Sequence, residues 1–181
     1  MYEYEIKLPI TAPEDLAARL AALGFEKTGT IREEDSYYNH PERDLKQAGL
    51  ALRLRKSTDL ADSRLTATLN FKGQRMDSRT MSRPEYETVV ADPAAAAGIL
   101  TGLGYVLAAP VIKERQYFRK AAVTACIDTV EGLGTYLELE ILSETAQAHD
   151  ACLARLDDLL RELRLSPEDT VTLSYLDLLG Y

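Results

Sequence analysis

The chain has 181 residues, of which 46% are apolar and 28% charged, and its formal net charge is -8 at pH 7. This size and composition suit one globular domain spanning residues 1–181, and the acidic balance argues against a general nucleic-acid binder. The sequence shows no leader-like segment and no run apolar enough for a membrane helix. Its two separated cysteines suggest neither a disulfide framework nor a zinc site. We therefore expect a cytoplasmic protein without nucleic-acid or membrane partners.

The first predicted element is a strand over residues 2–8, YEYEIKL. Glu3, Glu5 and Lys7 share one face of this strand, because side chains two residues apart point the same way. Aromatic and aliphatic side chains occupy the other face. Taken alone, the stretch predicts a half-buried strand whose polar face meets water.

Two predicted helices follow strands of the same kind. Residues 11–24 and residues 92–104 each begin beside a proline and end at a glycine followed by an aromatic residue. Each is preceded by a Glu-Tyr-Glu strand and followed by a segment of charges and aromatics. The ordered series indicates a degenerate duplication of two strand-helix-strand units.

The other predicted strands also carry one charged and one apolar face. They are LALRLRK (50–56), RLTATLNFKG (64–73), SRPEYETVV (82–90), VIKERQYFR (111–119), ACIDTV (125–130) and TYLELEI (135–141). Turns are expected at 59–63 and 74–82, a long amphipathic helix at 144–163 and a short closing helix at 174–179. Amphipathic helices are the available cover for the apolar faces, so the charged faces should point into an antiparallel sheet that curls or closes.

Such a concavity would hold both signs of charge. The cations are Lys7, Arg53, Arg55, Lys72, Arg83, Lys113 and Arg115, and the carboxylates are Glu3, Glu5, Glu85, Glu87, Asp128, Glu138 and Glu140. Like charges about 4 Å apart repel by roughly 4 kcal/mol at an effective dielectric near 20, so compensation is required. One interpretation is a hydrated network of ion pairs without a ligand. The other is a triphosphate site, in which cations grip phosphates and carboxylates bind Mg²⁺ or Mn²⁺.

The ordered motifs resemble the CYTH, or triphosphate tunnel metalloenzyme, superfamily. They are Glu3-x-Glu5-x-Lys7, LALRLRK, Lys72-Gly73, Arg83-x-Glu85-x-Glu87, Lys113-x-Arg115, IDTVEGLGTYLELEI and the terminal SYLDLLGY. VEGLG and SYLDLLGY look most like class IV adenylate cyclases. Two positions depart from the pattern: Gln74 stands where relatives often have proline, and Pro84 lies inside the Arg-x-Glu-x-Glu strand, directly after Arg83.

The resemblance implies an α+β fold, a closed or nearly closed eight-stranded antiparallel barrel with helices packed outside. It implies catalytic roles at the phosphates for Lys7, Arg53, Lys113 and Arg115. The implied phosphate-binding residues are Lys7, Arg53, Arg55, Lys72, Arg83, Lys113, Arg115 and Arg119. The implied ligands of Mg²⁺ or Mn²⁺ are Glu3, Glu5, Asp128, Glu138 and Glu140, while Glu85 and Glu87 fit either a metal-side or a network role.

The resemblance also favours conversion of ATP to cyclic AMP and pyrophosphate. Hydrolysis of thiamine triphosphate, inorganic triphosphate or a nucleotide is the closest alternative, because the same residues would serve it. A noncatalytic module that binds polyphosphate or nucleotide is a third, although pure anion binding would not need the carboxylates. Relatives often form homodimers, which is the expectation carried over to this chain.

Overall fold

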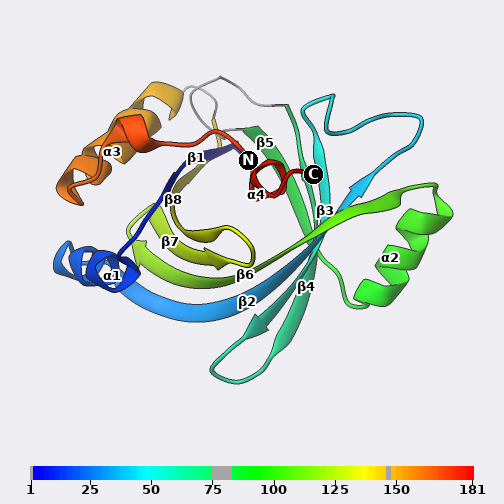
Figure 1. Ribbon diagram of the computed structural model, residues 1–181, viewed down its shortest axis with the longest axis horizontal. Coiled ribbons are helices and arrows are strands. Elements are labelled where there is room, and N and C mark those ends of the chain that lie inside the picture. Colours follow the sequence, from blue (N-terminus) through cyan, green and yellow to red (C-terminus); the bar gives the residue numbers. More distant parts are fainter. Residues whose placement is uncertain (1, 75–82, 146–147) are drawn as a thin grey trace.

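In the computed structural model, which describes residues 2–74, 83–145 and 148–181, eight strands form a closed antiparallel barrel (Figure 1). The strands are β1 (Tyr2–Pro9), β2 (Glu26–Asn39), β3 (Ala51–Asp59), β4 (Leu65–Lys72), β5 (Arg83–Val89), β6 (Val106–Lys120), β7 (Val123–Val130) and β8 (Gly134–Ser143). Their order around the barrel is β1-β5-β4-β3-β2-β6-β7-β8. The predicted α+β barrel is confirmed.

The duplicated pattern in the sequence reappears in the order of the elements. Helix α1 (Pro13–Ala22) joins β1 to β2, and helix α2 (Pro93–Gly102) joins β5 to β6. The second strands of the two units, β2 and β6, are long and pair with each other along most of their length. The two strand-helix-strand units therefore meet at the β2–β6 pair.

The helix boundaries follow the local signals in the sequence. Each helix has proline in its first turn, and the Asp92 side chain accepts hydrogen bonds from the first backbone N–H groups of α2. Gly24 and Gly104 follow the helices with φ of 83° and 91°, a left-handed conformation that glycine adopts without strain. The predicted turn at 59–63 also forms.

The predicted helix at 144–163 begins too early. Helix α3 spans His149–Glu162, because β8 continues to Ser143 and the chain then turns. Thr145 holds that turn: its backbone N–H donates to the Ser143 hydroxyl and its carbonyl accepts from the Tyr4 hydroxyl. Residues 146–147, and most of the turn predicted at 74–82, lie outside the described residues.

The helices cover the outer, apolar faces of the barrel, as predicted. Helices α1 and α3 lie on one side and α2 on the opposite side (Figure 1). Leu16 and Leu20 of α1 and Leu156 of α3 share a core with the apolar side chains of β1, while Leu100 of α2 packs with side chains of β3. In the part of the chain that the structure describes, no helix combines the length and apolarity needed to cross a membrane.

Candidate active site

The inward faces of the strands enclose a charged cavity of about 1150 Å³. Among its lining residues are Glu3, Glu5, Lys7, Arg53, Arg55, Lys72, Arg83, Glu85, Glu87, Lys113, Arg115, Arg119, Glu138 and Glu140. Lys7 is only 2% exposed, and Glu3 and Glu5 are also buried, so the expectation that this face of β1 meets water is wrong. The closed barrel has turned it inward.

The predicted site residues differ in their depth within the cavity. Arg119 and Glu87 are exposed, whereas Asp128 is fully buried and does not line the cavity. Pro84 is the second residue of β5, a position at the start of a strand where proline is tolerated. Arg83 therefore remains on the strand, buried, with its side chain at the cavity.

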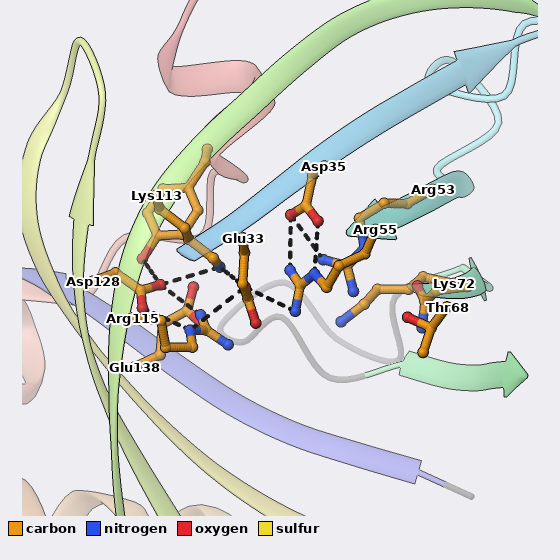
Figure 2. Close-up of polar contacts among 12 residues, drawn as sticks. Glu33, Asp35, Arg53, Arg55, Thr68, Lys72, Lys113, Arg115, Asp128 and Glu138 are labelled. Carbon is orange, nitrogen blue, oxygen red and sulfur yellow. Dashed lines mark hydrogen bonds and ion pairs between the residues drawn. The ribbon is translucent and has the colours of Figure 1, made fainter. Parts of the chain in front are cut away.

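One set of carboxylates is tightly paired with cations (Figure 2). Arg115 Nε lies 2.6 Å from Asp128 Oδ1, and the same guanidinium also contacts the Glu138 carboxylate. Lys113 Nζ lies 3.2 Å from Asp128 Oδ2. Burial opposes ionisation of Glu138, yet Arg115, Lys113 and further lysines outweigh it and hold the pKa of Glu138 well below its usual range. Glu138 is therefore ionised at neutral pH.

Two further members of this set, Glu33 and Asp35 of β2, were missed in the sequence. Arg55 binds Asp35 through two contacts of 2.6 and 2.7 Å, and its remaining nitrogen lies 2.9 Å from Glu33. Burial disfavours the charged form of Glu33, but Arg55 and Lys113 outweigh burial and lower the pKa of Glu33 to about 2. The same balance, with Arg53 foremost among the cations, lowers the pKa of Asp35.

The sequence contains a weak indication that Glu33 and Asp35 share one face of a strand. Glu33 and Asp35 occupy alternate positions of β2, as two residues on one face should. The neighbouring Arg32 and Glu34 are also charged, however, so β2 shows no contrast between a charged and an apolar face. We call Glu33, Asp35, Asp128 and Glu138, together with their arginine and lysine partners, the paired cluster.

A second set of carboxylates, Glu3, Glu5 and Glu140, has fewer cations near it; we call it the acidic cluster. Glu5 of β1 and Glu140 of β8 are register partners. The nearest cations are Lys72, whose Nζ lies 2.6 Å from Glu3, and Lys7, whose Nζ lies 4.0 Å from Glu5. Burial, followed by repulsion from Glu3 and Glu5, raises the pKa of Glu140 to about 8. Burial is also the main cause that raises the pKa values of Glu3 and Glu5.

The chemistry of the acidic cluster fits a hard divalent cation. Carboxylate oxygens are the preferred ligands of Mg²⁺, and a bound cation would offset both the burial and the repulsion that raise these pKa values. Within residues 2–74, 83–145 and 148–181, no three Asp, Glu, His or Cys side chains are arranged as a ready metal centre. This is compatible with Mg²⁺, which is commonly held by one or two carboxylates and completes its shell with water and substrate phosphates.

The cavity also contains donors suited to an anion. Arg53 Nε and Arg83 Nε are buried and have no hydrogen-bond partner among the described residues. A buried donor left unpaired costs about 1–3 kcal/mol, and a phosphate oxygen could satisfy it. Tyr117, by contrast, donates its hydroxyl to Glu33 at 2.8 Å and so belongs to the paired cluster. Both cysteines are buried and free.

These features define a class of protein: a closed barrel whose interior is lined by charged side chains rather than forming an apolar core. The chain belongs to the CYTH domain family, whose model matches residues 1–175. A Methanocaldococcus jannaschii protein named as a candidate adenylate cyclase is 32% identical over 180 residues, covering 99% of both chains. The adenylate cyclase CyaB of Aeromonas hydrophila is 28% identical over 96% of this chain and 86% of its own.

A solved structure supports the same fold. The PH1819 protein of Pyrococcus horikoshii has a TM-score of 0.89 and 29% identity, covering 98% of this chain and 97% of its own. The match therefore includes both the barrel and the helices that cover it.

Proposed function

We propose that this protein is a divalent-metal-dependent enzyme that converts ATP to cyclic AMP and pyrophosphate. The observation that carries the proposal is the division of one cavity into buried cations with free donors and a carboxylate cluster with too little positive charge. A triphosphate with its metal ion supplies the missing partner of each. The names of the two relatives from Methanocaldococcus jannaschii and Aeromonas hydrophila favour ATP as the substrate.

In this reaction the ribose 3′ hydroxyl oxygen forms a bond to the α-phosphorus and gives up its proton to water, and the bond from that phosphorus to the bridging oxygen breaks to release pyrophosphate. Negative charge builds up on the leaving pyrophosphate, so fixed cations around it lower the barrier. Lys7, Arg53, Lys113 and Arg115 would bind the phosphate oxygens. One or two carboxylates of the acidic cluster would hold the ion, which when bound neutralises phosphate charge and polarises phosphoryl oxygens. Asp128 and Glu138, the other ligands that the resemblance implied, are instead paired with Arg115 and Lys113.

The paired cluster has a different task in this mechanism. Asp128 and Asp35 fix the planes of Arg115 and Arg55 before the substrate arrives. A guanidinium held in place loses little conformational entropy on binding a phosphate, which improves both affinity and positioning.

The experiment is product analysis with ATP, thiamine triphosphate and inorganic triphosphate, each with Mg²⁺ or Mn²⁺ and each repeated with EDTA. Metal-dependent cyclic AMP and pyrophosphate from ATP are the expected products. Orthophosphate with a diphosphate would make the protein a hydrolase instead. Ligand binding without any product would favour a binding module.

A matched pair of variants tests the role of the carboxylates. Glu138→Gln should abolish turnover, because Arg115 loses a charged carboxylate that holds its guanidinium in place, while triphosphate binding persists because the cations remain. Glu34→Gln, on the outer face of β2, should leave both unchanged. An unchanged product yield from Glu138→Gln would contradict the proposed role of Glu138.

A further inference from the structure

The terminal motif SYLDLLGY forms part of the cavity wall. Its short helix α4 (Tyr175–Leu178) begins with a capping box, in which the Ser174 and Asp177 side chains each bind the other's backbone N–H. Figure 1 shows α4 at the barrel, far from the helices that cover its outer faces. Ser174, Tyr175, Leu176 and Asp177 line the same cavity as the phosphate-binding candidates.

Two contacts attach the α4 segment to two separate connections of the barrel, one between β2 and β3 and one between β7 and β8. Asp177 Oδ1 lies 3.1 Å from Lys46 Nζ, in the connection between β2 and β3. Leu179 lies against Gly132 in the turn between β7 and β8, where an added Cβ would stand 3.3 Å from Leu179 Cδ2. Through this attachment, the position of α4 is coupled to the closed barrel.

Tyr175 carries the contacts between α4 and the charged interior. The centre of its ring lies 4.2 Å from Lys7 Nζ and 5.0 Å from Lys113 Nζ, within cation–π range of both. Its hydroxyl donates a hydrogen bond of 2.9 Å to Asp128 Oδ2, and Tyr136 packs edge-on against the ring. One side chain therefore contacts two ammonium groups and the carboxylate that orients Arg115.

The Tyr175 ring holds the two ammonium groups without competing with a bound phosphate, as a further carboxylate would. A closely paired carboxylate would compete with phosphate for the ammonium N–H groups, as Glu3 does for Lys72 at 2.6 Å. The carboxylate partners of Lys7 and Lys113 stand farther away, at 3.2 to 4.0 Å. An aromatic face attracts a cation without accepting a full hydrogen bond, so it locates both ammonium groups and leaves donors for the substrate.

We propose that Tyr175 is a positioning residue, which places Lys7 and Lys113 for binding the phosphate chain and steadies Arg115 through Asp128. This inference rests on the proposed function, because it assumes that those cations bind phosphate. It assigns to the terminal motif the role of completing the phosphate site. The ring holds the lysines, and the hydroxyl separately supports Asp128.

The test compares Tyr175→Leu and Tyr175→Phe, with inorganic triphosphate as the probe in calorimetry. Tyr175→Leu removes both contacts and should weaken binding about tenfold. Tyr175→Phe retains the ring and should bind within about threefold of the unaltered protein. Leu173→Ala, at an exposed position directly before the same motif and outside the cavity lining, is the control and should bind normally.

A second readout separates positioning from a general loss of structure. In protein with ¹³C-labelled lysine, the ε-methylene signals of Lys7 and Lys113 should show a ring-current shift. The shift should disappear in Tyr175→Leu and persist in Tyr175→Phe. With Mn²⁺ and ATP, Tyr175→Leu should raise KM by a larger factor than it lowers kcat.

Two failures are distinguishable. If the unaltered protein does not bind inorganic triphosphate and Lys7→Ala changes nothing, the proposed function fails. If the unaltered protein binds it and Tyr175→Leu binds equally well, or if the lysine signals do not move, the positioning role of Tyr175 is overturned.

Discussion

The paired cluster and the acidic cluster lie inside the same barrel but have opposite electrostatic balance. In the paired cluster, arginine and lysine outweigh burial, and the pKa values of Glu33, Asp35 and Glu138 fall. In the acidic cluster, burial and mutual repulsion dominate, and the pKa values of Glu3, Glu5 and Glu140 rise. The difference separates carboxylates that are paired with the arginines of the barrel from carboxylates whose charge is not balanced by nearby cations.

The largest effect on stability should come from removing a cation of the paired cluster. Arg115→Met should lower the free energy of unfolding by about 3–5 kcal/mol, because fully buried Asp128 loses its closest partner. Denaturant unfolding measures this loss. Arg32→Met is the control: Arg32 pairs with Glu131 at the surface, and its loss should cost less than about 1 kcal/mol. Equal losses would contradict a structural role for the cluster.

Replacing Glu33, which the paired cluster stabilises in its charged form, should have the next largest effect. Glu33→Gln should cost about 2 kcal/mol at neutral pH, because Arg55 and Lys113 lose a buried partner. The folded pKa of about 2 lies below the ordinary 4.5, so this stability is present above pH 4.5 and is lost as the pH falls toward 2. The deficit of the variant should therefore shrink in acid. Denaturant unfolding between pH 2 and neutral pH measures this, with Glu34→Gln as the exposed control. A deficit of Glu33→Gln that stays constant with pH would contradict the lowered pKa of Glu33.

The stability that the acidic cluster contributes should change with pH in the opposite direction. The folded pKa of Glu140, about 8, lies above the ordinary 4.5, so its contribution is complete below pH 4.5 and is lost as the pH rises through 8. Without metal, Glu140→Gln should be more stable than the unaltered protein at pH 8, by about 1–2 kcal/mol. Unfolding measured with EDTA and with Mn²⁺ checks this, and Mn²⁺ should stabilise the unaltered protein more than the variant. Glu114→Gln, at an exposed position of β6, is the control and should not gain stability at pH 8. If the stability of Glu140→Gln and of the unaltered protein fell equally as the pH rises, Glu140 would not belong to the acidic cluster.

Lys7→Ala should have the smallest effect on stability and a clear effect on binding. The nearest carboxylates to Lys7 are 3.5 and 4.0 Å away; Glu138 keeps Arg115 as a partner and the pKa of Glu5 is raised by burial, so we expect a smaller loss of stability than for Arg115→Met. The affinity for inorganic triphosphate should fall about tenfold or more, since a charge-assisted contact is lost. Calorimetry and thermal unfolding, with the exposed Lys56→Ala as the control, measure both. A sharp fall in stability with unchanged affinity would favour an ion-pair network without a ligand.

Most of the barrel could be predicted because its strands alternate strictly. In β1, β3 and β8 the charged positions contrast with aliphatic ones, so the face of each residue could be read from its parity. The two helices marked by proline and glycine were also predictable, because their ends depend on local backbone conformation. The start of α3 was not, since the turn before it involves a hydrogen bond from Tyr4 to the Thr145 carbonyl, between residues far apart in sequence.

The candidate site was only partly predictable for a related reason. Glu33 and Asp35 lie on a strand that is charged on both faces, so only pairing with β3 and β6 shows which face is inside. Tyr175 could be recognised as part of a motif but had no assignable role. It meets Lys7 and Lys113 only because the chain returns to the barrel interior after α3.

The sequence by itself determined which side chains share the face of a strand, where the first two helices begin and end, and that most strands have a charged face opposite an apolar one. These properties depend on backbone geometry and on near neighbours along the chain. The tertiary structure decided that the charged faces point inward, and which carboxylate receives a cation. Pairing is settled by distances of a few ångströms between residues far apart in sequence, and burial then magnifies any imbalance of charge. For that reason Glu138 and Glu140, two residues apart on one strand, belong to clusters of opposite character.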